Sequence, residues 1–115
     1  MGKVHVNNNQ ILLPQLIQIY QPLDIDWLAY QITKGNVLTV HHVTKQEHGG
    51  LTSIDNSALL TKKAHRVLHI CEHKDFILYE EINDFFREII RAQSFNEVFQ
   101  EESKKYKKVL TKTIY

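Results

Sequence analysis

The spacing of apolar residues predicts helices in the first third of the chain. Ile11–Tyr20 is apolar at nearly every second or third position, and Pro14 suits the first turn of a helix there. A second helix is predicted over Asp26–Ile32, with an aspartate as its cap and Trp27 packing in the core. Residues 1–10 are polar, with three consecutive asparagines, and are expected to lie loose.

A short β-hairpin and a helix are predicted in the middle of the chain. Val37–Val40 is a β-type run, and Asn56–Thr61 is a second strand candidate after a long polar loop. Gly49 and Gly50 lie in that loop, where glycine permits backbone conformations and close chain approaches that other residues do not. Lys62–Cys71 follows with the spacing of a helix.

The C-terminal third is predicted to be helical and to end in a basic tail. Phe76–Ala92 has its apolar residues in one broad helical stripe, which covers the core or forms part of a dimer contact. Ser94 and Glu97 match a capping box for a last helix. The tail Ser103–Tyr115 carries five lysines and no acidic residue. Two interpretations of it stay open: a solvated, fraying end, which we favour, or an arm that contacts phosphates.

Composition limits the class of protein. A chain of 115 residues suits one domain with a single modest core, and 43% hydrophobic and 23% charged residues are typical of a globular protein. The net charge is only +1, so any attraction to phosphates must come from a local patch. The single cysteine, Cys71, excludes an internal disulfide and a Cys-pair zinc site. No apolar run reaches membrane-spanning length and the N-terminus lacks the apolar segment of a signal peptide, so we expect a cytoplasmic protein without a membrane partner.

Histidines are concentrated in residues 37–73, which hold six of the seven in the chain. His41 and His42 follow the first predicted strand, and His65 and His69 are four residues apart in the predicted helix. Residues at i and i+4 share one helix face, so the two helical imidazoles can bind one metal ion. A third imidazole from the strand end would complete a three-nitrogen site with an open position, which is typical of a catalytic metal.

A family resemblance rests on five features in order: the doublet His41-His42, the turn Gly49-Gly50, the pair Asp55-Asn56, the helical His65, and His69 one turn later. In this order they resemble the HNH endonucleases, and within them the His-rich subset that includes the colicin-type DNases. The resemblance implies an α+β fold with a ββα-metal core, made of a two-stranded antiparallel hairpin and a helix, surrounded by additional N- and C-terminal helices. It divides the chain into a helical cap (residues 1–36), the ββα-metal motif (37–73), and C-terminal helices with the basic tail (74–115). Many HNH proteins carry cysteine pairs beside the motif, and this chain lacks them.

The resemblance also implies the roles of the site residues. His41, His65 and His69 would bind one divalent metal ion, and His42 would be the general base that takes a proton from water. Asn56 would hold the long loop by side-chain hydrogen bonds. Three imidazoles favour a transition metal such as zinc, nickel or manganese over magnesium, which prefers oxygen ligands, although the family also tolerates magnesium. Because adjacent strand residues point to opposite faces, we expect the strand to twist or bulge where His41 and His42 reach one site.

The expected substrate of such a site is DNA, cleaved at a phosphodiester bond. Lys62, Lys63 and Arg66 lie in or near the first turn of the motif helix, whose dipole also attracts anions, and they are the best candidates for phosphate contacts. Lys45 in the loop is a weaker candidate. The same basic residues would also be expected on an ordinary solvent-exposed helix face that contacts no phosphate. No separate recognition domain is visible, so we expect either a weak sequence preference or specificity supplied by a homodimer or a partner protein.

The three other histidines are expected to lie outside the metal site. His48 beside the loop glycines is interpreted as a surface or loop-fixing residue, and His5 as inert. His73 lies one turn past His69, so geometry does not exclude it as a ligand, but the family pattern stops before it.

Two alternative functions stay open at this point. A non-catalytic nucleic-acid-binding or adaptor module on the same scaffold would keep the metal for structure, but it has no need of the base His42. A helical interaction protein with incidental histidines would bind no metal at all.

Overall fold

The computed structural model describes residues 3–115, with side chains from Gln10 onward. Strands β1 (Leu38–His42) and β2 (Ser57–Thr61) pair into a hairpin. The loop between them contains two single-turn 3₁₀ helices, η1 (Gln46–His48) and η2 (Ile54–Asn56). The α-helices are α1 (Lys3–Tyr20), α2 (Lys62–Lys74), α3 (Phe76–Ala92) and α4 (Glu97–Ile114). The predicted α+β class is confirmed, as is the antiparallel hairpin that leads into a helix.

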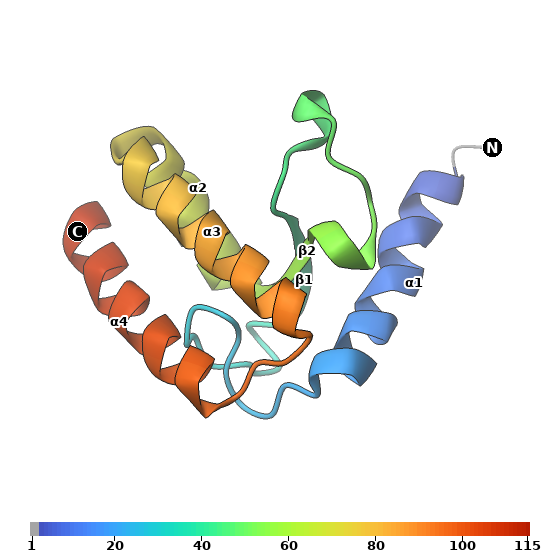
Figure 1. Ribbon diagram of the computed structural model, residues 1–115, viewed down its shortest axis with the longest axis horizontal. Helices are drawn as coiled ribbons and strands as arrows, with labels where there is room; N and C mark the ends of the chain where they lie inside the picture. The colour runs from blue at the N-terminus through green and yellow to red at the C-terminus, as the bar shows by residue number, and fades with distance from the viewer. Residues whose placement is uncertain (1–2) are drawn as a thin grey trace.

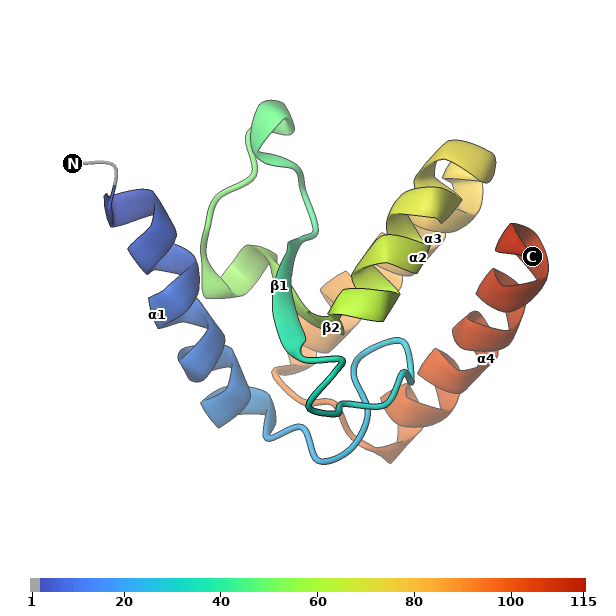
Figure 2. The same ribbon diagram turned by 180° about the vertical axis from the view of Figure 1, so that it is seen from behind.

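The hairpin lies between helices on two sides. In Figure 1, α1 runs along one side of the hairpin, α2 and α3 pack together on the other side, and α4 lies outermost beside them. Figure 2 shows the same order from behind, with the loop between the strands projecting beyond the hairpin. None of the helices in the described part of the chain combines the length and the apolar content needed to cross a membrane.

The hairpin and α2 form one continuous unit because β2 leads directly into the helix. The antiparallel register pairs Leu38 with Thr61 and His42 with Ser57. All five residues of β2 are buried. Thr61 ends the strand and caps α2, since its hydroxyl accepts a hydrogen bond from the amide of Ala64. This junction fixes α2 relative to β1, and with it the histidines that both elements carry.

The core lies where α3 packs against α2 and β2. The apolar stripe predicted on α3 is buried along most of the helix, including Ile82, Phe86 and Ile89. Trp27 is fully buried, as predicted, and its ring centroid lies 5.9 Å from that of Phe86. The segment between α1 and β1 therefore closes the core around α3.

The helix predicted over Asp26–Ile32 is wrong, because this segment is an irregular loop. The buried carboxylate of Asp26 accepts hydrogen bonds from the amides of Leu28 and Tyr30, which turns the chain back on itself. Ala29 between them has a φ of 64°, a left-handed conformation that a right-handed helix does not allow. An aspartate that the sequence suggested as a helix cap thus organises a turn instead.

The prediction that residues 1–10 lie loose is also wrong for the residues described. α1 begins at Lys3, so the run of asparagines is helical, and Pro14 lies inside the helix rather than in its first turn. Asparagine is only a weak helix former, but the later turns of α1 are held by burial of Leu12 and Leu16. Proline removes one internal hydrogen bond without ending this helix. The first two residues lie outside the described part of the chain.

The basic tail is not a fraying end. It belongs to α4, which continues to Ile114 and packs against α2, with Leu110 and Ile114 buried. These two residues are four apart and share one helix face, a narrow apolar stripe among the lysines. The helix is capped by Asn96, whose side chain accepts from the amide of Phe99, and not by Ser94 as predicted. Asparagine is as good a cap as serine and lies directly before the first helical residue.

Candidate metal centre

Four histidines line one cavity between β1 and α2. His41 and His42 come from the end of β1, and His65 and His69 from successive turns of α2. The ring centroids of His41 and His65 are 5.5 Å apart, and the stacked rings of His65 and His69 are 4.9 Å apart. The cavity has a volume of about 230 Å³, and its other lining residues are Lys45, Gln46 and Tyr79. Side chains that are far apart in the sequence are therefore neighbours in space.

Within the described hairpin, the predicted bulge at the histidine doublet is absent. Pairing is regular through His41, opposite Ala58, and His42, opposite Ser57. His41 points inward and is only 3% exposed, whereas His42 is half-buried. Both nevertheless line the same cavity.

Asn83 on α3 fixes the ring of His41. His41 Nε2 lies 3.0 Å from Asn83 Oδ1, and both side chains are buried. An amide oxygen only accepts hydrogen bonds, so the Nε2 of neutral His41 carries the proton and donates it. The other ring nitrogen, Nδ1, is left unprotonated and available to a ligand.

The two helical histidines are fixed in the same manner by other acceptors. Thr39 donates its hydroxyl proton to the carbonyl of Leu60 at 2.8 Å, so its oxygen accepts from His65 Nδ1 at 3.2 Å. A carboxylate oxygen of Glu72 accepts from His69 Nδ1 at 3.4 Å. In both rings Nε2 is therefore the free nitrogen.

Each of the three imidazoles thus offers one nitrogen to a metal ion, Nδ1 of His41 and Nε2 of His65 and His69. Metal-binding histidines in proteins usually have their other ring N–H held by an outer partner in this way. Three imidazoles are a donor set that suits a transition metal. Among the side chains described, from Gln10 onward, no three His, Cys, Asp or Glu residues already stand in metal-binding geometry. The three rings must therefore move closer together to bind an ion.

Burial favours the neutral form of three histidines in the cluster, His41, His42 and His65. It lowers the pKa of His41 to about 4, although the hydrogen bond with Asn83 acts in the opposite direction. Burial also lowers the pKa of His65, and repulsion from a protonated His69 or His42 adds to this shift. The pKa of His42 is lowered by burial alone. Because neutral imidazole is the form that binds metals, His41 and His65 do not need to lose protons before binding a cation at pH 7.

The loop between the strands orients His42, the predicted base. His42 Nε2 lies 3.2 Å from the hydroxyl of Thr52, which also accepts a hydrogen bond from the Gln46 side chain. Both partners of this arrangement lie in the loop, so the position of the His42 ring depends on the loop being ordered.

Asn56 ties that loop together. Its Oδ1 accepts from the amide of Thr44 at 2.7 Å, and its Nδ2 donates to the carbonyls of Thr44 and Leu51. A Cβ at Gly50 would overlap the Thr44 carbonyl and approach the Asn56 amide, while Gly49 has a φ of 87° at the end of η1. The two uses of glycine predicted for this loop are thus both present.

The predicted phosphate contacts differ in their availability. Lys62, Lys63 and Arg66 are exposed on α2. Lys45 instead forms an ion pair with Glu72 at the edge of the histidine cavity, and the hydrogen bond that Lys45 donates to Glu72 raises the pKa of Lys45. Burial alone would raise the pKa of Glu72, but hydrogen bonds from Lys45 and His69 outweigh it and lower that pKa.

His48 and His73 do not line this cavity. His48 is exposed on η1, with its Nε2 3.7 Å from a carboxylate oxygen of Glu47. His73 is exposed in the last turn of α2. The side chain of His5 lies outside the part of the chain whose side chains are described.

Sequence reasoning missed the partners that hold the rings: Thr39, Glu72 and Asn83, together with the neighbouring Tyr79. The Tyr79 hydroxyl and Asn83 Nδ2 are buried without a hydrogen-bond partner among the described side chains. One signal for them exists in the sequence, because Tyr79 and Asn83 are four residues apart within the apolar stripe of α3. Polar groups buried in such a stripe need a partner, and here the partner of Asn83 is His41.

Comparisons of the chain with protein-family models, with curated proteins and with solved structures find no match.

Proposed function

We propose that the protein is a metal-dependent endonuclease of the HNH type, which hydrolyses phosphodiester bonds in DNA. One observation carries the proposal: three imidazoles each have one ring nitrogen engaged by a separate partner and one left free, and a fourth histidine lines the same cavity. A cluster of imidazoles with free ring nitrogens suits cation binding, and the additional His42 suits hydrolysis rather than metal storage. The order of the motif along the chain agrees with this function.

In this proposal, three histidines bind the metal ion and a fourth acts as the general base. A divalent metal ion held by His41, His65 and His69 would act as a Lewis acid toward the scissile phosphate and the leaving oxygen. His42 takes the proton from the attacking water, and its lowered pKa keeps it unprotonated at neutral pH, as a base requires. The Thr52 hydroxyl orients the ring of His42.

Basic side chains on α2 grip the phosphates in this proposal. Lys62, Lys63 and Arg66 are exposed on the helix that also carries His65 and His69. The ammonium of Lys63 lies 5.8 Å from the ring centroid of Tyr30, and that of Lys107 on α4 lies 4.8 Å from the same centroid. Lys107 of α4 therefore lies near Lys63 of α2. Phosphate contacts release counterions, so binding of DNA should weaken with salt.

Nicking of supercoiled plasmid tests the proposal. The wild type, His42→Ala and the control His73→Ala are compared with added zinc, nickel, manganese or magnesium ions. We expect His42→Ala to keep the bound metal and lose cleavage by about 10²-fold or more, the usual contribution of a general base. His73→Ala removes an exposed imidazole from the same helix and should cut like the wild type.

Other outcomes would contradict the proposal in different ways. Cleavage by His42→Ala at the wild-type rate would remove this residue from the mechanism. DNA binding without cleavage under any metal would favour a nucleic-acid-binding or adaptor module. Absence of both metal binding and DNA binding would favour a helical interaction protein with incidental histidines.

A further inference from the structure

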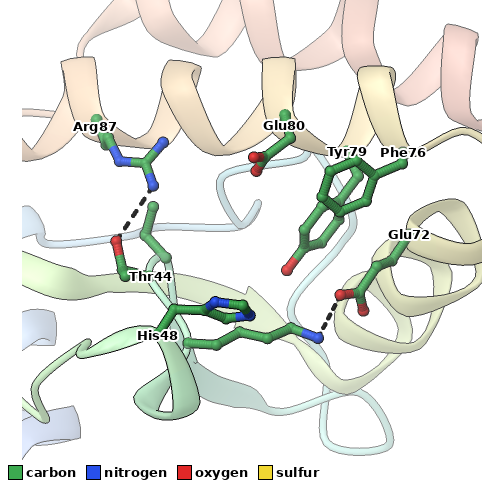
Figure 3. A pocket seen from close by; sticks show the side chains of 9 residues that line it. Thr44, His48, Glu72, Phe76, Tyr79, Glu80 and Arg87 are labelled. Atoms are coloured by element: carbon green, nitrogen blue, oxygen red, sulfur yellow. Dashed lines mark hydrogen bonds and ion pairs between the residues drawn. The ribbon is translucent and has the colours of Figure 1, made fainter.

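A second cavity adjoins the histidine cavity. It has a volume of about 260 Å³ and lies between the loop after β1 and the first half of α3. Lys45 and Tyr79 line both cavities, so the two spaces share part of one wall. Figure 3 shows the second cavity with α3 above it and Glu72 at its side. A ligand there would lie directly beside the proposed metal site.

One wall of this cavity is aromatic and exposed. The ring of Phe76 is 56% exposed although it is a large apolar side chain at the start of α3. It stacks on Tyr79 with ring centroids 5.8 Å apart and an interplanar angle of 30°. A flat aromatic surface that faces a cavity is a platform for stacking a flat ligand.

The remaining walls carry hydrogen-bonding groups of both kinds. The Tyr79 hydroxyl points from α3 into the cavity and has no partner among the described side chains (Figure 3). The carboxylates of Glu72 and Glu80 are acceptors on the same walls. Arg87 donates to Thr44 and Asp84, which leaves other guanidinium N–H groups free. Lys45 pairs with Glu72 and balances its charge, whereas Glu80 has no ion pair among the described residues, so its carboxylate suits a ligand with amino groups.

We propose that this cavity takes one unpaired nucleobase with an exocyclic amino group, from the strand whose phosphate lies at the histidine cluster. The base stacks on Phe76, its amino group donates to Glu72 or Glu80, and Arg87 contacts a backbone phosphate at the rim. The volume is just below that of typical small-molecule sites, which suits a single base rather than a whole nucleotide. This inference rests on the proposed function, and it makes the substrate a strand that is single or locally opened.

Binding of short single-stranded DNA in the presence of EDTA tests the inference without cleavage. Fluorescence anisotropy compares three labelled oligomers of equal length and charge: oligo(dC), oligo(dT) and an abasic oligomer. Cytosine and thymine differ in the amino group, and the abasic oligomer keeps only the backbone. We expect oligo(dC) to bind most tightly, and about 10-fold more tightly than the abasic oligomer, as one stacked base allows.

Two neighbouring substitutions supply the variant and its matched control. Phe76→Ala should bind all three oligomers with the affinity of the abasic one. Ile77→Ala removes an adjacent side chain that is 79% exposed and does not line the cavity, so it should keep the wild-type order. Equal affinity of the wild type for oligo(dC) and the abasic oligomer would overturn the inference, as would an unchanged order in Phe76→Ala. Equal affinity for oligo(dC) and oligo(dT) would overturn the role of the two carboxylates.

These outcomes are separable from failure of the proposed function. If plasmid is cut but the oligomers are not distinguished, the base site alone is wrong. If the oligomers are distinguished but plasmid is not cut with any metal, the base site stands and the nuclease activity is wrong.

Discussion

Two buried polar side chains support the ββα unit in different ways. Asp26 accepts four hydrogen bonds, from the amides of Leu28 and Tyr30 and from the amide and hydroxyl of Thr61. Asn83 makes one hydrogen bond, to His41, and its Nδ2 is buried without a partner among the described residues. The partners of Asp26 are backbone amides and Thr61, the residue that caps α2. The partner of Asn83 is His41, which lines the histidine cavity.

The difference separates a group that fixes the fold from one that serves a site. A fully bonded buried carboxylate holds one arrangement, because any movement leaves donors unpaired. A missing partner alone is not sufficient to mark a site. The Tyr20 hydroxyl and the Trp27 indole N–H are also buried without partners in the described part of the chain, yet their rings pack together in the aromatic core with centroids 4.8 Å apart. Asn83 is distinguished by its contact with the histidine cluster.

The largest effect is expected from breaking the Asp26 network. Asp26→Ala leaves four buried donors without an acceptor, and each unpaired group costs about 1–3 kcal/mol, so we expect a loss of about 4 kcal/mol or more in the free energy of unfolding. Urea unfolding followed by circular dichroism measures it. Asp26→Asn keeps one acceptor oxygen and should lose less. A loss below about 1 kcal/mol in Asp26→Ala would show that the network does not hold the fold.

Acid should destabilise the metal-free protein through the histidine cluster. The pKa of His41 is about 4 in the folded state because of burial and 6.5 in the reference state, so the unfolded chain binds more protons between these values. The contribution of neutral, buried His41 to the free energy of unfolding is complete above pH 6.5. It falls by about 3 kcal/mol as pH drops toward 4. Urea midpoints in EDTA at pH 7, 5 and 4 measure this loss. His41→Gln should unfold with a weaker pH dependence, and an identical dependence would exclude His41 as the group responsible.

A smaller effect, confined to the site, is expected from Asn83. Asn83→Ala should weaken metal binding by about 10–100-fold, because the ring of His41 loses the partner that fixes its tautomer. Asn83→Asp keeps an acceptor and should restore most of the affinity. Competition with a chromogenic chelator measures both. If Asn83→Ala binds metal as tightly as the wild type, the amide serves packing only.

The ββα unit and its histidines were predictable because local rules and spacing act together there. The i, i+4 spacing of His65 and His69 predicted that their rings are neighbours on one helix, and they are stacked on α2. The β-type run before His41 lies in β1. Asp26 shows the limit of local reasoning. An aspartate before an apolar run is compatible with a helix cap and with a turn, and the choice is made by Thr61, 35 residues away.

The partners of the histidine rings were not predictable for the same reason. Asn83 contacts His41 across 42 residues and Thr39 contacts His65 across 26, distances that no local pattern encodes. The tail shows a related limit. Its lysines dominate the composition, but two buried residues four apart, Leu110 and Ile114, decide that it is a packed helix.

The central claim, that the open histidine cluster binds a metal ion, is tested most directly by calorimetric titration with zinc at pH 7. The account predicts one ion per chain for the wild type and no specific binding for the triple variant His41→Ala, His65→Ala, His69→Ala, with loss of the thermal stabilisation that the metal confers. Binding of one zinc ion by the triple variant with wild-type affinity would contradict the account, because the ligands would then lie elsewhere.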